Sequence, residues 1–143
     1  LVDDAAILKG IRGTVPSVDL KSITDFTARL DAAMPESSKG VYDYGAETYD
    51  AIVISALAAE IAGCADGVSI GAQINGVTKG GEKCTDFASC LALVKAGTDI
   101  DYDGLGGPYE FADAGEPTAA SYRIITYGDA GADTSLDKYV FAS

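Results

Sequence analysis

The chain has 143 residues, the length of one ordinary domain, and its 48% hydrophobic and 22% charged residues are typical of a protein that folds. It carries 22 acidic and 10 basic residues, a formal charge of −12, which opposes binding to nucleic acid or anionic lipid. The longest apolar run, Ala51–Ala59, is interrupted by Ser55 and is shorter than the roughly 20 residues that span a bilayer. The sequence begins at Leu1 without a basic and apolar leader, so we expect any secretion signal to lie outside it.

The first elements in chain order are a short strand and an amphipathic helix. Residues Ile11–Val15 predict a strand that ends at Pro16. A helix is predicted from Ser22 or Thr24 to Met34, and the following proline ends the pattern. The apolar residues of this helix recur at helical spacing: Ile23, Phe26, Leu30 and Met34. We expect this face to lie on another part of the protein.

The clearest predicted element is a long helix from about Tyr44 to Ala62, with Gly63 as its C-terminal cap. Between Ala51 and Ala59 only Ser55 is polar, so the middle of the helix is apolar almost all round. A helix of this kind is typically buried on more than one side, as happens between two layers of a domain.

Two shorter helices follow. Val68–Asn75 predicts one that Gly71 weakens, and Asp86–Lys95 predicts another that ends before Gly97. We expect the glycine-rich segment between them, Gly76–Lys83, to be an exposed loop.

The last part of the chain changes to turn residues and β-favouring residues. We predict strands at Tyr109–Phe111 and Ala120–Tyr127, joined by a tight turn at Asp113–Pro117. The tail after Gly128 is polar until Tyr139. This order of elements predicts an α/β fold of layered helices and sheet strands.

An acidic segment resembles a calcium-binding loop. Asp99, Asp101, Asp103 and Glu110 stand at positions one, three, five and twelve of the EF-hand pattern, with glycine at position six. However, Gly106 occupies position eight, where an EF-hand has an apolar residue, and no helix is predicted to follow. A solvated acidic turn is therefore the favoured interpretation, and a calcium-stabilised secreted module remains an alternative.

Two other motifs lack the partners that their chemistry needs. Gly67–Gly71 matches a nucleophile elbow around Ser69, but the chain contains no histidine to act as the base. Gly76 and Gly81 have the spacing of a phosphate loop, but Glu82 occupies the place of its lysine. We therefore expect a protein that is not an enzyme and that has no catalytic residues and no cofactor or metal.

Three cysteines indicate the redox compartment. Cys84 and Cys90 bracket a predicted helix start, and their spacing favours a disulfide over the two-residue knuckles of a zinc site. A disulfide is typical of an oxidising compartment. We expect Cys64 to be a buried free thiol after the long helix.

Several strings occur in order: GIRGTVPSV from Gly10, YGAETYDAIVISALAAEIAG from Tyr44, DGVSIGAQINGVT from Asp66, and CTDFASCLALVKAGTDIDYDGLGGPYEFADAGEPTAASYRIITYGDAG from Cys84. Together they resemble the C-terminal part of the branched-chain amino-acid type of ABC-transporter solute-binding protein, in a form similar to actinobacterial members. The resemblance runs from about Gly10 to Gly128.

The resemblance implies a portion of the two-lobed type I periplasmic-binding-protein fold, whose lobes are joined by three crossing segments and close over a ligand. In that arrangement residues 1–15 would end a second-lobe strand at a hinge crossing. Residues 16–113 would belong to the first lobe, and residues 114–143 would return to the second lobe and form a C-terminal strand and tail. The acidic segment Asp99–Gly104 would be a structural turn.

The resemblance also implies a function for the complete protein. It would capture an amino acid or similar small polar solute outside the cell membrane, held there by a lipid anchor, and dock with an ABC permease. Tyr44 matches a position that can line the cleft, and Tyr42 is a weaker candidate; packing at a helix N-terminus is an equal interpretation of Tyr44. A stand-alone interaction domain is a further alternative, and exposed sheet edges favour self-association.

Overall fold

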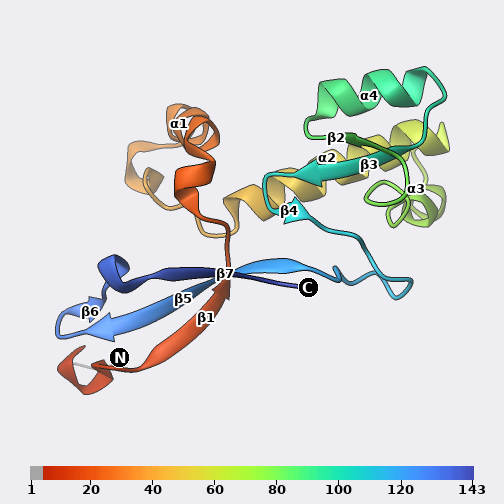
Figure 1. Ribbon diagram of the computed structural model, residues 1–143. Coiled ribbons are helices and arrows are strands. Elements are labelled where there is room, and N and C mark those ends of the chain that lie inside the picture. Colours follow the sequence, from red (N-terminus) through yellow and green to blue (C-terminus); the bar gives the residue numbers. More distant parts are fainter. Residues whose placement is uncertain (1–4) are drawn as a thin grey trace.

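A computed structural model describes residues 5–143 and shows a mixed α/β protein, with 41% helix and 25% strand. The described chain forms two parts that lie side by side (Figure 1). One is a helical part with a small three-stranded sheet, and the other is an antiparallel sheet that holds both ends of the described chain. The predicted α/β class is confirmed at this level.

The helical part packs three helices around a small sheet. Its helices are α2 (Gly45–Ala62), α3 (Gly67–Gln73) and α4 (Phe87–Lys95). Its strands are β2 (Glu82–Cys84), β3 (Ile100–Gly104) and β4 (Gly107–Pro108); β3 pairs with β2 in parallel and with β4 in antiparallel orientation. The main core lies between these elements and consists of Val53, Ile54, Leu57, Ala58, Val77, Cys84, Cys90, Ile100 and Tyr102.

A smaller cluster attaches helix α1 (Thr24–Ala33) to the start of α2. Its buried members are Val18, Ile23, Phe26 and Ala46, and the Phe26 ring lies 5.5 Å from the ring of Tyr49. Short 3-10 turns flank α1 at Leu20–Ser22 and Glu36–Ser38.

The second sheet has β5 (Ala120–Gly128) as its central strand. Strand β1 (Arg12–Pro16) pairs with one edge of β5, and β7 (Lys138–Ala142) pairs with the other. Strand β6 (Gly131–Ala132) closes a hairpin at the end of β5, and 3-10 turns lie at Ala5–Leu8 and Thr134–Leu136. No residue within these four strands is buried, so this sheet lacks a core of its own.

The predicted helices are all present, because local signals define their ends. Gly63 ends α2 with φ +65°, a left-handed conformation that glycine adopts without strain. Asp66 and Asp86 cap α3 and α4 by accepting hydrogen bonds from backbone N–H groups of the first turn. Strands β1 and β5 also agree with the predictions, except that β1 includes Pro16, which an edge strand tolerates.

The expectation that α2 is buried on more than one side was wrong. Its buried residues lie on a single face, and Ile52 on the opposite face is 65% exposed. Apolar composition alone does not decide which faces of a helix meet a partner, and no described element covers this face. Among residues 5–143 no single helix is long and apolar enough to span a membrane, although α2 and α3 pass that test as a pair bent by 106°.

The expected acidic turn at Asp99–Gly104 is a strand instead. Residues Ile100 to Tyr102 are buried in β3, and Tyr102 is completely inaccessible to solvent. The pairing with β2 gives these backbone groups hydrogen-bond partners, and Lys83 of β2 offsets the charge of Asp101 and Asp103. The alternating carboxylates of this segment favoured a solvated turn. The lysine that offsets their charge comes from a distant segment, so the local sequence pattern did not indicate a strand.

Two further predictions need correction. Tyr109–Phe111 is not a strand, because Glu110 has φ +43° and interrupts any extended run; the partners of β5 are β1, β6 and β7. The segment Gly76–Lys83 is not simply an exposed loop, since Val77 and Thr78 are buried and β2 begins at Glu82. The turn before β5 is present, and Phe111 pairs with Pro117 across it.

Candidate functional site

Tyr44 lies immediately before α2, in a strained backbone conformation. Its φ is +60° and its ψ is 11°, a left-handed geometry that residues with a side chain adopt at a cost of about 1 to 2 kcal/mol. The side chain is 54% exposed and makes no hydrogen bond to the described residues. About half of the Tyr44 side chain is therefore accessible to solvent, and no side-chain cap hydrogen bond accounts for the strained backbone.

Tyr42 lies two residues earlier and is held in place. Its hydroxyl donates a hydrogen bond of 2.6 Å to Asp31 of α1, which also accepts one of 3.1 Å from the N–H of Gly40. These bonds lower the pKa of Asp31, and the bond to Asp31 raises the pKa of Tyr42. The two predicted site tyrosines thus share one loop; the hydroxyl of Tyr42 is bonded within the protein, and the side chain of Tyr44 is half exposed.

A buried carboxylate, Asp50, joins α2 to the segment that follows β3. Asp50 is completely buried and accepts four hydrogen bonds. Two come from the hydroxyls of Tyr102 and Tyr109, each 2.6 Å long, and two come from the N–H groups of Leu105 and Gly106, at 3.0 and 2.7 Å. The carboxylate therefore holds the β3–β4 turn against the first turns of α2.

The surroundings of Asp50 leave no room for other side chains. A Cβ atom at Gly104 would collide with the Asp50 carboxylate, and one at Gly106 would collide with the Tyr109 hydroxyl. Burial, and then the hydrogen bond to Asp50, raises the pKa of both Tyr102 and Tyr109. We did not predict this group from the sequence, although an aspartate on the buried face of an apolar helix is a signal that could have found it.

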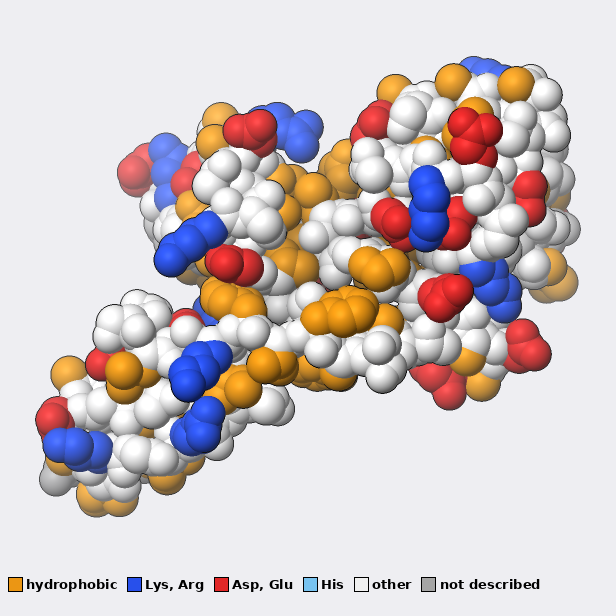
Figure 2. All heavy atoms as spheres, viewed as in Figure 1, with side chains coloured by type: hydrophobic (Ala, Val, Ile, Leu, Met, Phe, Trp, Pro, Cys, Tyr) orange, Lys and Arg blue, Asp and Glu red, His pale blue; other side chains and the backbone are white. Residues whose placement is uncertain are grey.

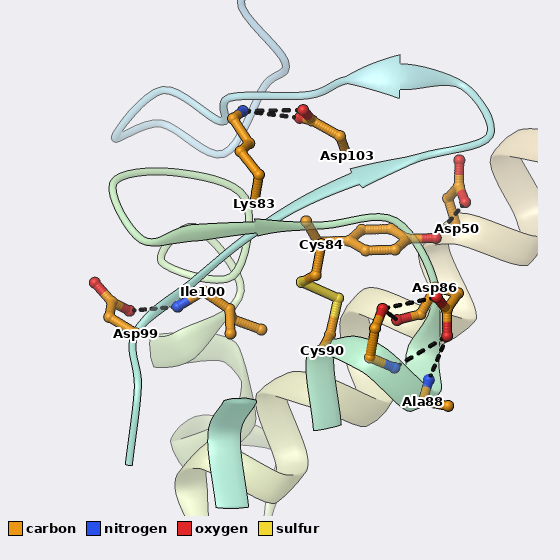
Figure 3. The surroundings of a disulfide bond; sticks show 11 residues. Asp50, Lys83, Cys84, Asp86, Ala88, Cys90, Asp99, Ile100 and Asp103 are labelled. Carbon is orange, nitrogen blue, oxygen red and sulfur yellow. Dashed lines mark hydrogen bonds and ion pairs between the residues drawn. A yellow bond between two sulfur atoms is a disulfide. The ribbon is translucent and has the colours of Figure 1, made fainter. Parts of the chain in front are cut away.

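The predicted disulfide is present between Cys84 and Cys90, whose Cα atoms are 5.3 Å apart. Figure 3 shows that it ties β2 to the first turns of α4, beside the cap made by Asp86. Cys64 is free, as predicted, but it is exposed and not buried, because the chain has already left α2 through Gly63. Its thiol donates a hydrogen bond of 3.1 Å to Asp66.

The carboxylates of the EF-hand-like segment do not converge on a common point. Lys83 Nζ lies 2.9 Å from Asp101 and 3.0 Å from Asp103, so the ammonium group of Lys83 pairs with both carboxylates. Figure 3 shows its pair with Asp103. Within residues 5–143 no group of three or more His, Cys, Asp or Glu side chains is placed to hold a metal ion.

The other two motifs, around Ser69 and around Gly76 and Gly81, belong to structural elements of the fold. Ser69 lies in the first turn of α3, where it is hydrogen-bonded to Asp66, the residue that caps this helix, and the sequence has no histidine to act as the base. Gly81 lies so close to the backbone of Asp99 and Ile100 that a Cβ would collide with it. Gly81 therefore allows β2 and β3 to approach each other, and Glu82 belongs to β2.

The two parts of the protein border a shared hollow of about 360 Å³. From the helical side it is lined by Val18, Ser22 and the turn Leu105–Gly107, and from the sheet by Ser121 and Tyr139–Phe141. The same turn is held by Asp50, so this carboxylate positions one wall of the hollow. Apolar side chains of the two parts meet along this junction in Figure 2.

Comparisons with protein-family models, with curated proteins and with solved structures found no match for this chain. The fold and the sites show a mixed α/β protein with one disulfide between described cysteines, a kind of bond typical of oxidising compartments, and with two parts that border a hollow.

Proposed function

We propose that this chain is the C-terminal portion of a solute-binding protein of an ABC importer, of the branched-chain amino-acid type. The complete protein would capture an amino acid or a similar small polar solute without covalent chemistry and deliver it to the permease. In this proposal the 143 residues are mainly scaffold, and Tyr44 is the residue that meets the solute.

The path of the chain is the observation that carries the proposal. The chain leaves the antiparallel sheet after Pro16, builds the whole helical part, and returns through the segment before Ala120 to complete the sheet (Figure 1). Two connections that run between two bodies in this way are what a two-lobed, hinged binding protein requires. The boundaries expected from the resemblance, at residues 15 and 114, fall close to these two connections.

The compartment agrees with the proposal. The disulfide between Cys84 and Cys90 is typical of proteins outside the cytoplasm. A binding protein of this type works at the cell surface or in the periplasm, where a lipid anchor would keep the complete protein near its permease.

The properties of Tyr44 suit a residue that touches a ligand. Strained non-glycine residues are kept mostly where function requires them, and an exposed aromatic ring offers apolar contact at small entropic cost. Its position at the start of α2 places it in the part of the chain that the resemblance assigns to the cleft.

Substitution of Tyr44 by glycine in the complete protein separates a ligand role from a structural one. Glycine adopts the left-handed conformation freely, so Tyr44→Gly should raise the free energy of unfolding by about 1 kcal/mol. It should also weaken amino-acid binding about tenfold, because the aromatic contact is lost. Urea denaturation and titration calorimetry with a panel of amino acids measure the two effects.

Val41 provides the matched control, since it is exposed in the same loop and Val41→Ala should change neither quantity. A loss of stability in Tyr44→Gly would show that the ring packs structurally. Amino-acid binding by the isolated 143 residues at micromolar concentrations would contradict the proposal that they are mainly scaffold. Calorimetric binding of calcium tighter than about 1 mM would instead favour the calcium-module alternative.

A further inference from the structure

The chain passes between its two parts at two short crossings. The N–H of Ser17 donates a hydrogen bond of 3.0 Å to a carbonyl of β5, so this residue still belongs to the sheet, whereas Val18 is buried in the cluster around α1. On the return, the N–H of Thr118 donates a hydrogen bond of 3.3 Å to the carbonyl of Tyr109, and β5 begins two residues later. Crossings that are only a few residues long are able to act as hinges between two bodies (Figure 1).

Away from these crossings, a single polar side-chain contact joins the two parts among residues 5–143. The guanidinium of Arg123, in β5, lies 3.6 Å from the carboxylate of Asp43, in the loop before α2. That loop is fixed to the helical part, because the hydroxyl of Tyr42 is bonded to Asp31 of α1. The position of the sheet against the helical part is therefore coupled to the state of this ion pair.

A second carboxylate lies beside Arg123 within the sheet. Nε of Arg123 is 3.7 Å from Asp137, the residue that directly precedes β7. Charge-assisted hydrogen bonds from a guanidinium are about 2.7 to 2.9 Å long, so Arg123 is hydrogen-bonded to neither Asp43 nor Asp137. Nε and one carboxylate oxygen of Asp137 are buried and have no hydrogen-bond partner among the described residues. The guanidinium thus lies at nearly equal distances from two carboxylates.

The two carboxylates compete for the same edge of the guanidinium. Asp137 faces Nε and Asp43 faces Nη2, and these two nitrogens form the edge that binds one carboxylate through two parallel hydrogen bonds. Buried polar groups without partners cost free energy, so Arg123 gains by bonding fully to either carboxylate. Since one carboxylate fills the edge, a full bond to Asp43 excludes a full bond to Asp137.

The surroundings give the Arg123 side chain room to move and offer it no third partner. A hollow of about 350 Å³ lies beside Arg123 and Asp137, between the Leu20–Ser22 turn and Tyr139. The other charged residues of this hollow are Asp19 and Lys21, which belong to that turn: the Asp19 carboxylate accepts a hydrogen bond from the N–H of Lys21. Among the described residues neither forms an ion pair with Arg123.

We propose that Arg123 is a switch residue that exchanges between Asp43 and Asp137. When it bonds to Asp43, it ties the sheet to the helical part and holds the two parts in one orientation. When it bonds to Asp137, the contact stays within the sheet, and the two parts turn about the crossings. This inference concerns the two parts of the 143-residue chain and does not rest on the proposed transport function.

The unequal exposure of the two carboxylates makes the exchange sensitive to salt. The side chain of Asp43 is 56% exposed and that of Asp137 is 9% exposed. Ions in solution screen an exposed ion pair more than a buried one, so added salt favours the bond to Asp137. An ion pair with an exposed carboxylate changes a population only about two- to fivefold, so both arrangements are populated at low salt.

Distances between spin labels on the two parts measure the exchange. Arg12→Cys in β1 and Lys95→Cys in α4 place one label at an exposed position of each part, and Cys64→Ser removes the free thiol. Pulsed electron paramagnetic resonance on the whole chain should give a distance distribution that broadens when NaCl is raised from about 20 to about 300 mM. A distribution that salt leaves unchanged would overturn the proposal.

The two carboxylates provide a pair of variants with opposite expected effects. Asp43→Asn leaves Asp137 as the carboxylate partner, so the distribution at low salt should become at least about 1.5-fold broader and lose its response to salt. Asp137→Asn leaves Asp43 as the partner, so the distribution should become narrower than that of the parent chain. Arg123→Gln should behave like Asp43→Asn, because both remove the link between the parts.

Glu36→Gln is the matched control, since Glu36 is exposed and pairs with Lys39 within the helical part; it should not change the distribution. Broadening in both Asp43→Asn and Asp137→Asn would show that Arg123 needs the two carboxylates together in one fixed network, and it would overturn the exchange. Unchanged distributions in both variants would show that the pair does not control the orientation. Circular dichroism spectra that match the parent chain establish that each variant is folded, and the salt response of the parent chain needs no variant at Asp43, Asp137 or Arg123.

Discussion

Asp50 shows how one residue can decide the arrangement of a whole segment. Its two carboxylate oxygens each accept one tyrosine hydroxyl and one backbone N–H, so the buried charge is fully hydrogen-bonded. Burial of a carboxylate without such partners would cost a large amount of free energy. With these four hydrogen bonds, Asp50 holds the glycine-rich turn in a single conformation.

Replacement of Asp50 by asparagine should destabilise the protein by about 3 kcal/mol. The asparagine side chain has a similar shape, but its NH₂ group takes the place of one carboxylate oxygen. That group donates hydrogen bonds and would face a backbone N–H and a hydroxyl that also donate. Urea denaturation followed by circular dichroism measures the change. Glu60→Gln, on an exposed position of the same helix, is the control and should change the free energy of unfolding by less than about 0.5 kcal/mol.

The two tyrosines bonded to Asp50 predict a loss of stability in alkali. Their pKa is raised above the ordinary value of 10.0 in the folded protein, so the unfolded chain releases these protons first. Stability is therefore fully present below pH 10 and falls as the pH rises above it, by up to about 1.4 kcal/mol per pH unit for each tyrosine. Denaturation curves between about pH 8 and pH 11.5 test this, and the slope should flatten in Tyr109→Phe. A slope that is unchanged in that variant would contradict the assignment.

At the scale of elements, the disulfide links a strand to a helix in the main core. Cys84 and Cys90 are both buried, and the bond closes the chain around the start of α4, where Asp86 caps the helix. The strand, the helix cap and the bond therefore reinforce one another within a few residues.

Removal of the disulfide should weaken this region measurably. Cys84→Ala combined with Cys90→Ala should lower the free energy of unfolding by about 2 kcal/mol, the value expected for a short closed loop. Cys64→Ser, at the exposed free cysteine, is the control and should have no effect. A reducing agent should reproduce the effect of the double variant in the parent chain and leave the double variant unchanged. Equal stability of the parent chain and the double variant would show that the bond contributes nothing.

For the whole molecule, the uneven distribution of the core predicts uneven stability. The helical part contains the main core, including Leu57, Ile100 and Tyr102, whereas none of the four strands of the other sheet contributes a buried residue. Local unfolding is easiest where few apolar contacts must be broken, so the sheet should open before the helical part does.

Hydrogen exchange tests this prediction. The amides of β5 should exchange at least about tenfold faster than those of β3, although both strands lie in the centre of their sheets. Uniform protection at low concentration would show that the sheet is as stable as the helical part.

The sequence by itself determined the features that depend on neighbouring residues. Helix ends followed from capping residues such as Asp86 and Gly63, strand β1 from a short segment before a proline, and the disulfide from the spacing of two cysteines. These signals act within a few residues, because a cap or a turn is satisfied locally.

Only the tertiary structure decided features that join distant segments. Lys83 neutralises carboxylates about 20 residues away, which turned an expected acidic turn into a strand, and Asp50 meets hydroxyls more than 50 residues away. The composition of α2 likewise did not determine that only one of its faces is buried. It also did not determine how exposed the Tyr44 side chain is. The burial and pairing of a residue depend on which distant segments the fold places next to it. The residues adjacent in sequence do not specify those segments.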